Sequence, residues 1–197
     1  YSGPLGRFRI GSNYYDVYKN EPESLNFIHW FGNLDIKHKI LIAGNHDAYT
    51  FHMKTKFKEW CAHYGIIYLE NEGCEIEGIK FWGSPNTPTF GNWYYMKDRG
   101  KMNNHWSHVP EDTDVFICHG PCKGILDLSY NREGTLEFCG DKALRNHVLN
   151  RIKPKLFLFG HIHNFEDIIN AGTTKLSSYD TIFSNGSVVT DRKFGVL

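Results

Sequence analysis

The apolar residues of this chain gather in short continuous runs that alternate with stripes at helical spacing. Continuous runs are typical of strands buried on both faces, and stripes with steps of three and four residues are typical of amphipathic helices. These patterns predict strands at residues 39–43, 66–69, 114–118 and 156–159, and helices at 22–34, 57–64 and 141–152. Because the two patterns alternate, we expect a single α/β domain.

Stretches rich in Gly, Pro, Asn and Tyr separate these elements. Residues 1–20 and 84–108 show no clear period and predict loops, and a loop as long as the second is often functional in a compact domain. Glu77-Gly78 lies between two strand-like runs and predicts a hairpin at 75–82. Two further short strands are expected near 179–183 and 187–189.

Three of the predicted strands run directly into polar turns that contain histidine. The turns are Gly44-Asn45-His46-Asp47, His119-Gly120-Pro121 and Gly160-His161-Ile162-His163. In open α/β sheets, sites form just past the carboxyl ends of strands, so we expect the turns to meet in one crevice. Any one of them alone could be an ordinary turn with polar tips. Together they offer imidazole, amide and carboxylate donors, a set that suits Zn, Mn or Fe.

Composition argues against several other classes of protein. The chain carries 22 basic and 22 acidic residues, so bulk charge gives no support for a nucleic-acid or membrane partner. No apolar run approaches the ~20 residues of a membrane span. The five cysteines form no CxxC pair, which favours reduced thiols and a cytoplasmic protein. Cys118 and Cys122 could be spaced for zinc, but two uninvolved thiols are the simpler interpretation.

The three turns resemble the later motifs of the calcineurin-like metallophosphoesterases. Four intervening stretches resemble the small metallophosphoesterase-domain-containing branch of that superfamily: Trp82-Gly83-Ser84-Pro85, Asn92-Trp93, Ile125-Leu126-Asp127 and Lys153-Pro154-Lys155. The resemblance extends from about residue 22 to the C-terminus. It implies a four-layer α-β-β-α sandwich, and one metallophosphoesterase domain over residues 1–197 in which residues 1–20 are atypical.

The same resemblance implies roles for individual side chains. The residues expected to bind divalent metal ions are Asn45, His119, His161 and His163. The first three would bind one ion, and His163 would bind a second. His46 would contact the scissile phosphate and help the leaving oxygen to depart, while Asp47 would orient His46. The expected reaction is attack of a metal-activated hydroxide on phosphorus.

Two motifs that come earlier in this family have no counterpart upstream of residue 44. They are an Asp-x-His, and a Gly-Asp whose carboxylate bridges the two metal ions. Gly11-Ser12-Asn13 lies about where Gly-Asp is expected, Asp16 is the nearest aspartate, and no clear first strand precedes the helix. Without the bridging carboxylate, two neighbouring dications would repel each other strongly.

Two explanations of the missing motifs stay open at this stage. The chain is either an altered or truncated piece of a two-metal protein, or a divergent member that binds one ion or none. The first hypothesis is therefore a metal-dependent phosphodiesterase of nucleotides, with cyclic nucleotides among the candidates. The alternative is a catalytically impaired relative that binds nucleotides or partners. A nuclease of the same superfamily is disfavoured, because the chain has no net positive charge.

Overall fold

A computed structural model describes residues 7–10, 13–131, 133–165 and 167–187 of the chain. Its largest element is a six-stranded sheet with the order β13-β14-β12-β9-β6-β5. The strands are β5 (Glu72–Ile76), β6 (Ile79–Ser84), β9 (Val115–Cys118), β12 (Leu156–Phe159), β13 (Gly172–Lys175) and β14 (Ile182–Asn185). The four inner strands are parallel, and the two edge strands are antiparallel to their neighbours.

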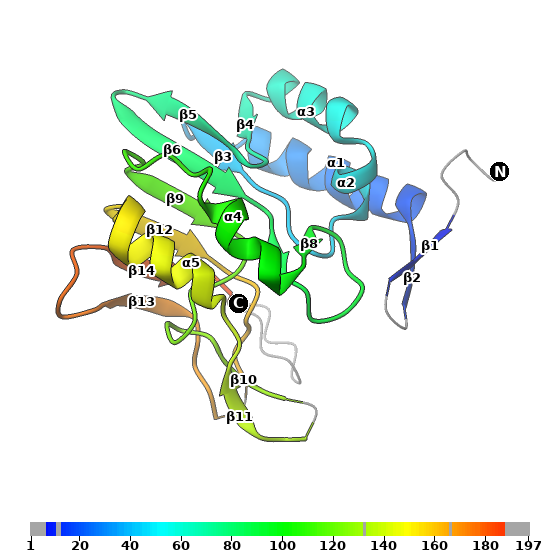
Figure 1. Cartoon of the computed structure of the whole chain (residues 1–197). Helices are drawn as coiled ribbons and strands as arrows, with labels where there is room; N and C mark the ends of the chain where they lie inside the picture. Colours follow the sequence, from blue (N-terminus) through cyan, green and yellow to red (C-terminus); the bar gives the residue numbers. More distant parts are fainter. Residues whose placement is uncertain (1–6, 11–12, 132, 166, 188–197) are drawn as a thin grey trace.

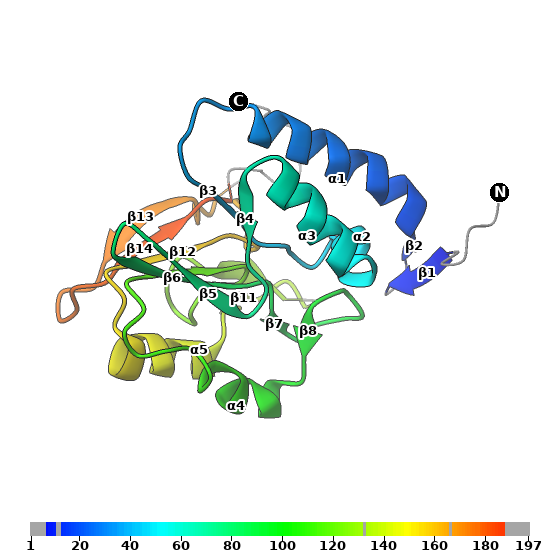
Figure 2. The ribbon, with the colours of Figure 1, turned by 90° about the horizontal axis from the view of Figure 1, so that it is seen from above.

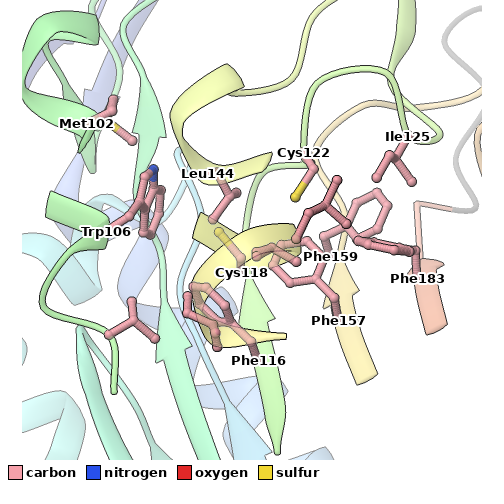
Figure 3. Close-up of a cluster of buried hydrophobic side chains, with 14 residues drawn as sticks. Met102, Trp106, Phe116, Cys118, Cys122, Ile125, Leu144, Phe157, Phe159 and Phe183 are labelled. Atoms are coloured by element: carbon pink, nitrogen blue, oxygen red, sulfur yellow. The ribbon is translucent and has the colours of Figure 1, made fainter. Parts of the chain in front are cut away.

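Two helical segments cover one face of this sheet (Figure 2). They are α4 (Met102–Trp106) and α5 (Lys142–His147), which continues as a π-helical turn, η2 (Val148–Ile152). Trp106 and Leu144 from the helices meet Phe116 and Phe157 from the strands, and all four are at most 1% exposed (Figure 3). This apolar contact is why the continuous runs at 114–118 and 156–159 form central strands.

A second, smaller sheet with its own helices lies on the opposite face of the six-stranded sheet (Figures 1 and 2). Its two parallel strands are β3 (Lys39–Leu41) and β4 (Ile66–Tyr68), and its helices are α1 (Val17–Gly32), α2 (Ala48–His52) and α3 (Lys54–His63). Their buried apolar side chains form a separate cluster that includes Ile28, Phe57 and Tyr49. Helices, sheet, sheet and helices thus follow one another, which confirms the expected α/β sandwich.

Further pairs of short strands lie outside these two sheets. They are β1 (Arg7–Ile10) with β2 (Asn13–Asp16), β7 (Thr87–Pro88) with β8 (Met96–Lys97), and β10 (Leu128–Tyr130) with β11 (Leu136–Phe138). Figures 1 and 2 place β1 and β2 beyond the first turn of α1, at the edge of the molecule. Asp16 ends β2 there.

Several sequence-based boundaries are wrong. The first helix begins at Val17, so Pro22 lies inside it, where it removes one helical amide donor without ending the helix. The predicted loop at 1–20 contains β1, β2 and the start of α1, and the predicted loop at 84–108 contains β7, β8, a 3₁₀ turn (Arg99–Lys101) and α4. The strand expected at 179–183 lies at 182–185, and residues 188 and 189 lie outside the described part.

Other predictions are confirmed. The hairpin turns at Glu77-Gly78, whose φ angles of 51° and 79° fit a tight turn. All five cysteines are free thiols, and Cys118 is 1% exposed.

Candidate metal centre

The histidine turns at 119 and 160–163 lie side by side because β9 and β12 are parallel neighbours. The backbone connects these turns across the sheet. The His119 amide donates to the Ser84 carbonyl at 2.9 Å, and the Gly160 amide donates to the His119 carbonyl at 3.1 Å. Three parallel strands therefore hold the two turns in fixed register at the carboxyl edge of the sheet.

Asn45 brings the third turn to the same place from β3. Its Oδ1 lies 2.7 Å from His119 Nε2 and 3.1 Å from His161 Nδ1. Asn45 is 3% exposed, and the imidazole rings of His119 and His161 lie 4.7 Å apart between centroids. The structure thus brings together three of the four residues that the sequence nominates as metal ligands.

Gly44 is required at the position before Asn45. A Cβ atom at this position would lie 2.6 Å from Cε1 and 2.8 Å from Nδ1 of His119. Any larger residue would therefore push the His119 imidazole away from Asn45. The sequence gives Gly44 as part of a motif, but only the packing shows that the glycine makes room for a ligand.

The turn after β12 is bent at His161 itself. His161 has a φ angle of 73°, a left-handed conformation that is rare for residues with a side chain. The preceding glycine, Gly160, is not among the residues with positive φ. Strained backbone of this kind is held in place by its surroundings and is common at functional sites.

Burial makes the histidines of this cluster poor bases. Desolvation lowers the pKa of His119 well below its usual value and that of His161 to about 4, and the charge of neighbouring imidazoles lowers both further. Partial desolvation by neighbouring atoms and the nearby His163 also lower the pKa of His46, although its side chain reaches the surface. Neutral imidazole is the form that coordinates metal ions, so the electrostatics favour ligation over protonation.

The remaining predicted residues flank this trio. His46 is exposed, and its ring lies 4.6 Å from the Trp93 ring. Asp47 Oδ2 accepts a hydrogen bond of 2.6 Å from the Gly44 amide, and burial raises the pKa of this carboxyl. Asp47 therefore stabilises the turn that presents Asn45, and whether it also orients His46 stays a prediction. His163 is close enough for its charge to affect the pKa of His46, His119 and His161.

The donor trio of Asn45, His119 and His161 fits one divalent ion. In an octahedral site, adjacent ligands at ~2.0–2.2 Å from a divalent ion are about 3 Å apart, which is the spacing observed around Asn45 Oδ1. Within the described part of the chain, no three His, Cys, Asp or Glu side chains form a group that could hold a metal ion. The trio is not such a group, because one of its three donors is the amide oxygen of Asn45; with this oxygen included, three donors are available to one ion. A second ion at His163 has no such group around it among the described residues.

Two buried asparagines that the sequence did not reveal hold the His161–His163 turn. Asn170 Nδ2 donates to the His163 carbonyl at 2.7 Å, and Asn185 Nδ2 donates to the Ile162 carbonyl at 3.1 Å. They are 1% and 3% exposed. Asn170 follows Ile168-Ile169 and Asn185 is the last residue of β14, but neither belongs to a motif that the sequence analysis could connect with the histidine turns.

A cavity of about 580 Å³ opens beside this centre, and His161 forms part of its wall. Its aromatic lining includes Phe90, Tyr130 and Phe138, which are 40–48% exposed, and its cationic side chains are Arg99 and Lys123. The cavity is large enough for a nucleotide-sized ligand.

Four aromatic residues of the long segment 84–108 lie in different environments and do not form one surface. Phe90 lines the cavity and lies 5.2 Å from the His161 ring, while Trp93 contacts His46. Tyr94 and Tyr95 are 7% and 5% exposed and belong to the core beneath α1. Only Phe90 is therefore placed to meet a ligand in this cavity.

Comparison with known proteins agrees with this geometry. Residues 12–165 match the family described as calcineurin-like phosphoesterase. The chain belongs to the calcineurin-like phosphoesterase family. It is 32% identical to metallophosphoesterase domain-containing protein 1 of Homo sapiens and of Mus musculus, over 77% of this chain and 52% of the relative. It is 30% identical to a UPF0046 protein of Caenorhabditis elegans, over 70% of this chain and 50% of the relative.

The chain therefore spans about half the length of the curated relatives that it matches. A solved structure with 16% sequence identity superposes with a TM-score of 0.59 over 86% of this chain and 66% of the other, which supports the fold alone. Members of the family are generally phosphoesterases that use divalent metal ions. Among the described helices, none is long and apolar enough to cross a membrane.

Proposed function

We propose that this chain is a metal-dependent phosphodiesterase that acts on nucleotide-type phosphoesters and uses one divalent ion at Asn45, His119 and His161. The observation that carries the proposal is that His161 lies both next to Asn45 and in the wall of the large cavity. Its Nδ1 lies 3.1 Å from Asn45 Oδ1, and its ring also forms part of the wall of the 580 Å³ cavity. A phosphoester bound in the cavity would thus have its phosphorus near the metal ligands.

Each element of the site has a chemical task in this proposal. A divalent ion, when bound, supplies Lewis acidity toward a phosphoryl oxygen and lowers the pKa of water. His119 and His161 remain neutral because of burial, so their nitrogen lone pairs are available to the ion. The negative charge of a bound phosphoester would favour the protonated form of His46, which lies exposed beside the trio, and the imidazolium would then give its proton to the leaving oxygen.

The cavity wall supports a substrate with an aromatic group and additional negative charge. Phe90 lies against His161 and presents an exposed ring on which a base can stack. Arg99 and Lys123 supply positive charge for phosphate oxygens on the cavity wall. Mononucleotides and cyclic nucleotides carry both features.

The test is turnover of bis(p-nitrophenyl) phosphate and of a cyclic nucleotide in the presence of manganese. We expect His161→Ala and His46→Ala to lose at least ~100-fold in kcat/KM. The matched control is His108→Ala, since His108 is exposed and contacts the Asn104 carbonyl outside the site. Equal turnover in the wild type and in both site variants would reject the proposal.

The Phe90 ring gives a finer test of the nucleotide class. Phe90→Ala should raise KM for the cyclic nucleotide by about tenfold, because a stacking partner contributes ~1–3 kcal/mol. It should change KM for a dimethyl phosphodiester little, since that substrate has no ring. An equal effect on both substrates would remove the argument for a base in this cavity.

A second candidate function is phosphoester binding without turnover. It is favoured by the lack of a second metal-binding group around His163 among the described residues. Metal content and turnover separate the two candidates. A wild-type protein that binds one manganese ion and a nucleotide but shows no hydrolysis would establish the binding function.

A further inference from the structure

Two buried side-chain amides connect one wall of the large cavity to the His161–His163 turn. This wall is the hairpin of β10 and β11, which Figure 1 shows projecting from the body of the molecule. The hairpin lines the cavity of about 580 Å³ with Ser129, Tyr130 and Phe138 among other residues. His161 and Ile162 of the turn line the same cavity, so a ligand inside it can contact the hairpin and the turn together.

Asn170 carries the first of the two amides. Its Oδ1 accepts from the Leu128 amide at 3.0 Å, and its Nδ2 donates to the Leu128 carbonyl at 2.8 Å. The same Nδ2 donates to the His163 carbonyl at 2.7 Å. The side chain therefore bonds to β10 as a neighbouring strand would, while its second N–H holds the turn.

Asn185, at the end of β14, repeats this arrangement. Its Nδ2 donates to the Leu126 carbonyl and to the Ile162 carbonyl, both at 3.1 Å. Leu126 and His161 have left-handed backbone, with φ angles of 50° and 73°. Such strain persists only where surrounding contacts hold it, and here one amide group bonds at or next to both strained residues.

The burial of these amides makes the connection stiff. Asn170 and Asn185 are 1% and 3% exposed, and both N–H groups of each amide are engaged. Separation of the hairpin from the turn would leave buried carbonyls unpaired, which costs more than an exchange of partners at a wet surface. The hairpin base and the turn should therefore move together.

Asp127 closes the base of the hairpin at the point where the asparagines attach. Its Oδ2 accepts from the Gly124 amide at 3.0 Å and from the Gly140 amide at 2.7 Å. Its carbonyl accepts from the Cys139 amide at 3.0 Å. Both strands of the hairpin are thus tied together there, so a displacement of either strand reaches the two asparagines.

We propose that Asn170 and Asn185 are positioning residues that make the hairpin wall and the His161–His163 turn act as one unit. A ligand that contacts the hairpin thereby sets the His161 imidazole relative to Asn45, so binding in the cavity and binding of the metal ion strengthen each other. The effect on the metal centre rests on the proposed function, whereas the connection between hairpin and turn does not.

The test loosens the hairpin without a change at either asparagine. Ser129 lies opposite Glu137, and cross-strand bonds from the Cys139 and Asn131 amides flank this pair. Because hydrogen-bonded pairs alternate in antiparallel strands, the Glu137 amide points to β10. Glu137→Pro removes this N–H donor. Glu137→Ala loses the same carboxylate but keeps the N–H group, so it is the matched control.

The measurement is amide hydrogen exchange of the metal-free 197-residue chain over residues 126–131 and 160–164. Glu137→Pro should speed exchange in both segments by at least about tenfold, and Glu137→Ala should leave the turn unchanged. Val148→Ala, a change in the core of the larger sheet, controls for a general loss of stability and should not single out the turn. Faster exchange in the hairpin alone would overturn the proposal.

A double-mutant cycle separates coupling from simple support of the turn. Asn170→Ala and Asn185→Ala should each speed exchange over residues 160–164. Glu137→Pro should then add less than about threefold in either background, because one of the two connections is already lost. Fully additive effects would mean that the asparagines support the turn independently of the hairpin, and would overturn the proposal. If one asparagine variant does not fold, the other variant and the Glu137 pair still decide.

Manganese titration separates failure of this inference from failure of the proposed function. Glu137→Pro should weaken manganese binding by about tenfold, whereas Glu137→Ala should change it less than about twofold. A loosened hairpin with unchanged manganese affinity would overturn the coupling of wall and metal site. A wild type that neither binds manganese nor hydrolyses phosphodiesters would reject the proposed function, and hydrogen exchange would still decide whether hairpin and turn are coupled.

Discussion

The two sheets of this molecule support the metal centre unequally. In the six-stranded sheet, β9 and β12 have neighbours on both edges and deliver His119 and His161. In the two-stranded sheet, β3 has one described neighbour and delivers Asn45. The comparison teaches that one donor of the trio depends on a weaker framework than the other two. Metal affinity should therefore be limited by the β3 side.

Core packing shows the same inequality. Both cores contain residues at 0% exposure, such as Phe157 of the larger sheet and Ile28 of α1, but on the β3 side Leu41 and Ile42 remain partly exposed next to a second, smaller cavity. Apolar burial is the main favourable term in folding, so the larger sheet should carry most of the stability.

The largest expected effect comes from removing one large side chain from each core and comparing the losses in free energy of unfolding. Phe157→Ala should lower the free energy of unfolding by about 4 kcal/mol, because it leaves a new void in closed packing. Phe57→Ala should cost about 3 kcal/mol, at the low end for a buried phenylalanine, because Phe57 already lines the cavity beside β3. Urea denaturation of both variants measures the difference. Equal costs, or a larger cost at Phe57, would contradict the unequal support of the two sides.

A pair of glycine substitutions separates the metal centre from general stability. Gly44→Ala should weaken metal binding by about tenfold, because its Cβ would overlap the His119 imidazole. Gly78→Ala meets no atom within 4 Å, but its φ of 79° is unfavourable for alanine, so it should cost about 1 kcal/mol of stability and leave metal binding unchanged.

Calorimetric metal titration and thermal denaturation of both glycine variants provide the check. A Gly44→Ala protein that binds metal like the wild type would show that the close approach to His119 is unimportant. A Gly78→Ala protein with weakened metal binding would show that any loss of stability disturbs the centre.

The smallest expected effect concerns His105 on the α4 side of the larger sheet. Burial lowers its pKa to about 4, and its buried Nε2 has no hydrogen-bond partner. The unfolded chain, with a His pKa of ~6.5, binds more protons between these values, so stability falls as pH decreases from about 6.5 toward 4. His105→Leu should reduce the loss of stability between pH 7.5 and pH 5 by about 1 kcal/mol.

Denaturation at the two pH values measures the effect of His105 protonation, with His63→Leu on α3 as the exposed control. A pH dependence identical to that of the wild type in His105→Leu would show that protonation of His105 does not oppose folding.

The parts of this molecule that follow from the sequence are those dominated by continuous apolar runs. The runs at 114–118 and 156–159 form the strands β9 and β12, because nothing competes with their burial. The histidines that follow these strands then lie together by sheet geometry, which is why the trio around Asn45 could be nominated in advance.

Features that depend on tertiary contact could not be predicted in the same way. The short helix α4 has a weak pattern of its own and forms because Met102 and Trp106 reach the core. The left-handed backbone at His161 and the role of Gly44 in accommodating His119 arise from contacts between distant segments. The start of α1 could not be predicted either. Proline often marks the first turn of a helix, but Pro22 lies inside α1, which begins at Val17.

The central claim is that Asn45, His119 and His161 together hold one divalent ion. Its most direct test is calorimetric titration of the metal-free chain with manganese or zinc, alongside Asn45→Ala and the control His108→Ala. We predict one equivalent bound by the wild type and by His108→Ala, and an affinity at least ~100-fold weaker in Asn45→Ala. Wild-type affinity in Asn45→Ala, or no metal bound by the wild type, would contradict the account.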